Sequence, residues 1–80
     1  MNISKAVAIR ISQLLQEKEM TQYALEQKTG LSHDTIKSIM KGKAKGVNLK
    51  TILIISEGFE MSASEFINCE LFKYENLNLD

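Results

Sequence analysis

Apolar side chains recur at helical spacing in the first part of the chain. Four of them fall on one face of a helix from about residue 3 to residue 18: Ile3, Val7, Ile11 and Leu14. Thr21 follows this segment, and its hydroxyl can accept a backbone N–H from the first turn of a second helix. The pattern therefore predicts two helices joined by a short connection.

A glycine separates the second predicted helix from a third. The second helix, "QYALEQKT", ends at Gly30, because a residue without Cβ suits the left-handed turn that closes a helix. Ser32 can cap the third helix, in which Ile36 and Ile39 lie three residues apart on one face. Gly42 ends this third helix.

The second half of the chain predicts two more helices and a tail without a clear period. Asn48 can cap a fourth helix, "LKTILIISE", which stops at Gly58. The tetrapeptide "SASE", which begins at Ser62, fits a capping box at the start of a short fifth helix. We therefore expect one all-α, five-helix domain over residues 1–68, followed by a C-terminal tail over residues 69–80.

Composition narrows the class of protein. The chain has 80 residues, 44% of them hydrophobic, with four glycines and no proline, which favours one compact helical domain. A single cysteine, Cys69, cannot form an internal disulfide, and no apolar run approaches the roughly 20 residues of a membrane helix. Polar residues also interrupt any signal-peptide core near the N-terminus. We expect a soluble cytoplasmic protein.

Charge is unevenly distributed, although the net charge is zero. Residues 33–50 contain five lysines and one aspartate, whereas residues 51–80 contain one lysine and six acidic side chains. The middle of the chain therefore attracts phosphate, and the C-terminal third repels it.

The polar residues of the third helix do not form a catalytic site. Ser32, His33 and Asp34 are consecutive, so on a helix their side chains point about 100° apart and cannot form a relay. His33 is the only histidine, and neither it nor Cys69 has a partner at metal-ligand spacing. We expect no enzyme activity, no metal and no cofactor.

Two short helices joined by a tight glycine turn, the second with a polar outer face, describe a helix-turn-helix. The stretch from Gln22 to Lys41 resembles the phage repressor and Cro-type (XRE-like) helix-turn-helix family. The resemblance is carried by Thr21-Gln22, Leu25, Gly30 and the run "LSHDTIKSIMKGK", with "GFEMSASEF" similar to the junction of helices four and five. It implies a compact five-helix domain that binds double-stranded DNA sequence-specifically, regulates transcription as a repressor and forms a homodimer.

The third helix is the element expected to read bases, because a helix fits the major groove and its N-terminal residues reach base edges. The expected base contacts are His33, Asp34, Lys37 and Ser38. Phosphate contacts are expected from lysines, hydroxyls and helix N-termini. These backbone contacts are Gln22, Thr35, Lys41, Lys43, Lys45 and Asn48.

Glu26 departs from the family pattern, which usually has a small residue after Leu25 where the two helices approach. We expect either that Glu26 leans outward or that the angle between the helices opens slightly.

Two alternatives remain open at this point. The chain is either a DNA-binding regulator or a protein-interaction or antitoxin-type module that keeps the fold with weak or no DNA binding; the lysines from Lys37 to Lys45 favour the regulator. The apolar tail either folds back over the first helix or packs against a second copy. For the second possibility the expected dimer residues are Leu71, Phe72, Tyr74 and Leu77.

Overall fold

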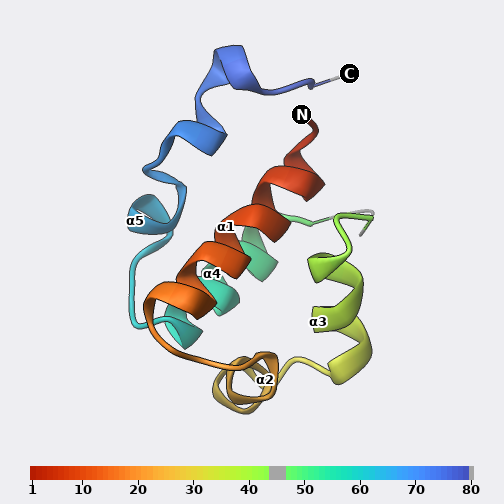
Figure 1. Cartoon of the computed structure of the whole chain (residues 1–80), viewed down its shortest axis with the longest axis vertical. Helices are drawn as coiled ribbons and strands as arrows, with labels where there is room; N and C mark the ends of the chain where they lie inside the picture. Colours follow the sequence, from red (N-terminus) through yellow and green to blue (C-terminus); the bar gives the residue numbers. More distant parts are fainter. Residues whose placement is uncertain (44–46, 80) are drawn as a thin grey trace.

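The computed structural model describes residues 1–43 and 47–79, and within them the chain is helical and compact (Figure 1). Its elements are α1 (Ile3–Glu17), α2 (Gln22–Thr29), α3 (His33–Met40), α4 (Leu49–Gly58), α5 (Ala63–Ile67) and two single-turn 3-10 helices, η1 (Glu70–Phe72) and η2 (Tyr74–Asn76). The all-α, five-helix prediction is confirmed. The two 3-10 turns were not predicted.

A side-chain cap starts each α-helix. The caps are Asn2, Thr21, Ser32, Asn48 and Ser62, and each accepts the backbone N–H three residues further along at 2.8–3.1 Å. At α5 the capping box is complete, because the Glu65 carboxylate also accepts the Ser62 N–H at 3.0 Å. Four of these caps agree with the sequence prediction, and Asn2 is an addition.

Left-handed backbone closes several of the helices. Gly30 has φ 74° and Gly42 has φ 68°, as their lack of a Cβ allows. Glu19 (φ 53°) and Glu60 (φ 58°) adopt the same region with a full side chain, which strains the backbone at these two turns.

The core lies between α1 and the helices around it. Its fully or nearly buried members are Val7, Ile11, Leu14, Leu15, Leu25, Ile36, Ile39, Ile52, Ile55, Phe59 and Phe66. α1 packs against α3, and α2 packs against α4. Gly58 lies where α4 packs against α2. Its lack of a side chain is needed there because a Cβ would lie 2.6 Å from the Thr29 methyl group.

Arg10 joins α1 to α5. Its Nε donates to the Phe66 carbonyl oxygen at 2.7 Å and an Nη to that of Glu65 at 3.1 Å. The guanidinium also lies over the Phe66 ring, 5.9 Å from its centroid. This residue therefore satisfies carbonyls at the end of a helix too short to be stable alone.

The tail folds back over α1. Phe72 packs against the core, with its ring centroid 6.0 Å from that of Phe66. The Met1 amine donates to the Asn76 carbonyl at 2.9 Å, and the Asn78 N–H donates to the Met1 carbonyl at 2.8 Å. Figure 1 shows the two ends of the chain side by side. None of the described helices is long and apolar enough to cross a membrane.

Candidate nucleic-acid interface

The turn between α2 and α3 is held by hydrogen bonds as well as by Gly30. The Thr29 hydroxyl donates to the Leu25 carbonyl at 2.8 Å and accepts the Leu31 N–H at 3.2 Å. Leu31 then packs against the core, and Ser32 caps α3. These contacts fix where α3 begins relative to α2.

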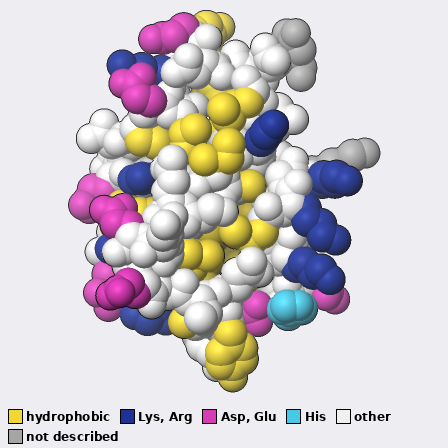
Figure 2. Space-filling view, in the orientation of Figure 1, with side chains coloured by type: hydrophobic (Ala, Val, Ile, Leu, Met, Phe, Trp, Pro, Cys, Tyr) yellow, Lys and Arg dark blue, Asp and Glu magenta, His cyan; other side chains and the backbone are white. Residues whose placement is uncertain are grey.

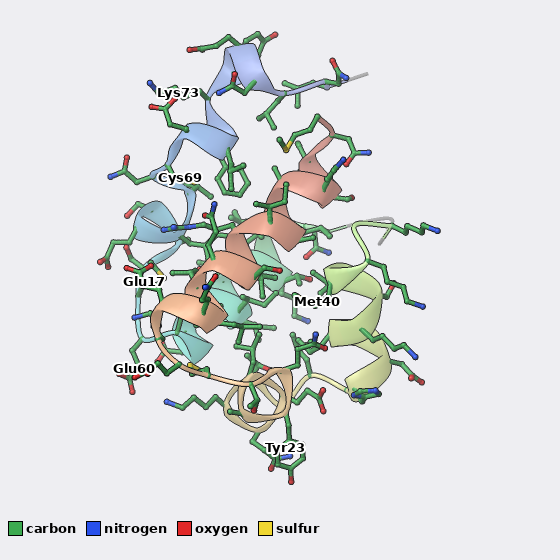
Figure 3. The ribbon with its side chains drawn as sticks, in the orientation of Figure 1. Glu17, Tyr23, Met40, Glu60, Cys69 and Lys73 are labelled. Carbon is green, nitrogen blue, oxygen red and sulfur yellow. The ribbon has the colours of Figure 1, made fainter. Side chains whose placement is uncertain are left out.

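α3 has one buried face and one exposed face. Ile36 and Ile39 are 1% and 3% exposed, and Met40 points towards α1 (Figure 3). The opposite face is exposed throughout: His33, Asp34, Lys37, Ser38 and Lys41. The structure therefore brings the four expected base-reading residues onto one accessible surface of a single helix.

The residues expected to contact phosphates differ in how free their side chains are. Gln22 and Lys43 are exposed, at the start of α2 and just after α3. The Thr35 hydroxyl accepts a hydrogen bond from the Ser32 hydroxyl at 2.8 Å, and the Asn48 oxygen accepts from both N–H and hydroxyl of Thr51. The side chains of Thr35 and Asn48 are therefore engaged in helix caps. The donors left for a phosphate at these positions are the backbone N–H groups in the first turns of α3 and α4. Lys45 lies outside the described residues.

Basic side chains gather along the edge formed by α3, and acidic side chains along the opposite edge (Figure 2). Lys28 is paired with Glu60 at 3.6 Å and Lys73 with Glu70 at 2.9 Å. In the described part of the chain, no ion pair involves Lys5, Lys37, Lys41, Lys43 or Lys50. The lysines near α3 are thus free to neutralise an external anion.

Comparison with known proteins agrees with this geometry. A sequence model of the Cro/C1-type HTH (helix-turn-helix) DNA-binding domain matches residues 10–71. The chain belongs to this family. No curated protein and no solved structure matches the chain significantly.

Membership in the Cro/C1-type family confirms the helix-turn-helix prediction and supports a DNA-binding regulator in general. Families of this kind are typically non-enzymatic. Among the described residues there is no group of three or more His, Cys, Asp or Glu side chains placed to hold a metal ion.

Lys5 precedes the matched residues 10–71 and is a basic neighbour of α3 that sequence reasoning missed. A Cβ built on Gly42 would be 3.4 Å from the Lys5 Cα, so the first turn of α1 lies against the turn that follows α3. Together with Lys41 and Lys43, Lys5 lines a shallow groove of about 530 Å³ between α1 and α3. Only the packing of α1 on α3 reveals this neighbour, because 37 positions separate Lys5 from Gly42 in the sequence.

Of the two expectations for Glu26, the structure excludes the one in which its side chain leans outward. Its side chain is only 11% exposed, so it does not lean into solvent. Instead its Oε2 lies 2.9 Å from Nδ1 of His33, the first residue of α3. The residue that departs from the family pattern is therefore bonded to a residue expected to read bases.

Proposed function

We propose that the chain is a cytoplasmic transcriptional repressor that reads duplex DNA by placing α3 in the major groove. The observation that carries the proposal is the division of α3 into two faces. Ile36 and Ile39 anchor the helix, while its outer face presents donors and acceptors beside lysines that form no ion pair with any residue the structure describes. A helix of this kind fits the major groove, where each base pair shows a distinct pattern of donors and acceptors.

Each exposed side chain of α3 suits a particular contact. Lys37 is a donor for guanine O6 or N7, and Asp34 accepts from the cytosine N4 amino group. Ser38 can donate or accept. Lys41 and Lys43 attract phosphates and add affinity without sequence information, as do the N-termini of α2 and α4.

A homodimer would let two copies of α3 read half-sites about one helical turn apart. Tyr74 is 80% exposed and Leu79 51% exposed, on a tail that lies along α1. Phe72 already packs on the core of its own chain, so it offers less surface to a partner than Tyr74. We place the dimer contact at Tyr74 and Leu77, with Leu71 beside them.

Selection of bound fragments from a pool of random duplex DNA tests the proposal. The expected result is a two-fold symmetric motif that Lys37→Ala degrades at one position in each half-site. Lys18→Ala is the matched control, because it removes the same charge from the end of α1, outside α3, and should leave the motif unchanged.

Failure to enrich any motif with the unmodified chain would contradict the proposal. It would favour a protein-interaction or antitoxin-type module, for which the exposed tyrosine and leucine of the tail are the available surface.

A further inference from the structure

Glu26 and His33 form the one side-chain hydrogen bond between α2 and α3 within the described residues. Glu26 Oε2 lies 2.9 Å from His33 Nδ1, and the carboxylate is 11% exposed while the imidazole is 65% exposed. The carboxylate of the pair is thus mostly covered on α2, and the imidazole is accessible at the start of α3. In Figure 2 the histidine, shown in cyan, sits at one end of the row of lysines along α3.

The chemistry of the two groups fixes which ring nitrogen carries a proton when the imidazole is neutral. An ionised carboxylate can only accept hydrogen bonds, so Nδ1 must carry the proton. In the neutral imidazole the other nitrogen, Nε2, is then an acceptor. No residue in the described chain hydrogen-bonds to Nε2, so this acceptor is available to an external donor.

The charges around the ring are few. α2 contributes the Glu26 carboxylate, and α3 contributes Asp34 next in sequence and Lys37 one turn further on. Among these three groups, the Glu26 carboxylate is the one hydrogen-bonded to an imidazole nitrogen. Neither Asp34 nor Lys37 forms an ion pair with His33. The imidazole end of the pair is 65% exposed, so its second nitrogen stays accessible to a ligand.

We propose that Glu26 is a positioning residue that makes His33 a tautomer-specific base reader. This inference rests on the proposed function. In the neutral imidazole, Nε2 accepts a hydrogen bond from a base amino group, adenine N6 or cytosine N4, in the major groove. When the imidazole gains a second proton, Nε2 becomes a donor and the same position prefers guanine O6 or N7. One base pair of each half-site is therefore read in a pH-dependent way.

Glu26→Gln tests the role of the carboxylate with little change of shape. The Gln amide can accept from Nδ1–H or donate to an unprotonated Nδ1, so both tautomers become available. His33→Gln removes the imidazole. Glu17→Gln is the matched control, because it removes a carboxylate on the side of the molecule away from α3 (Figure 3).

The experiment is fragment selection followed by binding measurements at about pH 8 and about pH 5.5. For the unmodified chain, one position should change from adenine or cytosine at high pH to guanine at low pH. At high pH, Glu26→Gln should weaken discrimination at that position by about 3- to 10-fold, the range of one neutral hydrogen bond. His33→Gln should abolish the pH dependence, and Glu17→Gln should change neither.

The outcomes separate this inference from the proposed function. If the unmodified chain selects no motif, the proposed function itself fails. If it selects a motif that Glu26→Gln leaves intact at every position and both pH values, the positioning role is overturned. Equal loss of affinity on all sequences in Glu26→Gln would also overturn it, because that result describes a purely structural contact.

Discussion

The contact between α2 and α4 predicts that Gly58→Ala destabilises the fold. A Cβ at this position would lie 2.6 Å from the Thr29 Cγ2, about 1 Å closer than two carbon atoms comfortably approach. The threonine cannot easily turn its methyl group away. Its hydroxyl holds the Leu25 carbonyl and the Leu31 N–H, and rotation would break both bonds.

The magnitude follows from two opposing terms. Overpacking of a tight contact costs about 1–3 kcal/mol, whereas replacing glycine by alanine in a helix gains at most about 1 kcal/mol. Gly58 is the last residue of α4, so the gain is smaller there. We expect a net loss of roughly 1–2 kcal/mol, which lowers the melting temperature of a domain of this size by about 5–15 °C.

A double-mutant cycle isolates the clash. Thr29→Ser removes the methyl group and keeps the hydroxyl, and the nearest remaining atom to a new Cβ is then the Leu25 Cδ1 at 3.2 Å, at the mobile end of a side chain. Far-UV circular dichroism during urea unfolding measures the four free energies. In the serine background Gly58→Ala should cost close to nothing. The same cost in both backgrounds would refute this explanation of the glycine.

Four further predictions concern DNA affinity, fold stability, assembly and acid stability. Lys43→Ala should weaken binding to all DNA sequences alike and make the slope of log K against log salt shallower by about 1, measured by fluorescence anisotropy; an unchanged slope would remove Lys43 from the interface. Arg10→Met should lower the free energy of unfolding by about 1–3 kcal/mol without changing base preference, since its bonds to the Phe66 and Glu65 carbonyls are structural. Tyr74→Ser should leave the helical spectrum intact while sedimentation shows fewer dimers, and dimers of unchanged strength would argue against the tail contact. The Ser62 N–H, the Ser62 hydroxyl and the charge of Lys18 hold the pKa of Glu65 below its ordinary value, so this carboxylate stabilises the fold above that value and the benefit is lost as the pH falls through the lowered pKa; urea titrations should show less acid destabilisation in Glu65→Gln.

Local features of this fold were readable from the sequence because their interactions span only three or four residues. Thr21, Ser32, Asn48 and Ser62 each cap a helix with their own side chain, and Gly30 closes α2 with a left-handed backbone. Apolar spacing likewise identified which face of α3 is buried. The exposed face that carries the candidate base contacts followed from the same periodicity.

Contacts between distant segments were not predictable in this way. Arg10 bonds carbonyls 55 and 56 positions away, and Lys5 meets the turn after α3 only because α1 packs there. The pairing of Glu26 with His33 needed the relative placement of α2 and α3, since either side chain alone is consistent with a solvated helix. The tail lacked a period because it forms two short 3-10 turns, the first of which packs on α1, rather than an amphipathic helix.

Amide chemical-shift mapping of the labelled chain with its selected duplex tests the central claim most directly. Because the chain has no proline, every residue after the first contributes an amide. The largest shifts should fall on α3 and on the first turns of α2 and α4, with a scrambled duplex giving smaller shifts confined to the phosphate-facing positions. Shifts concentrated on α5 and the tail, with α3 unchanged, would contradict major-groove reading by α3.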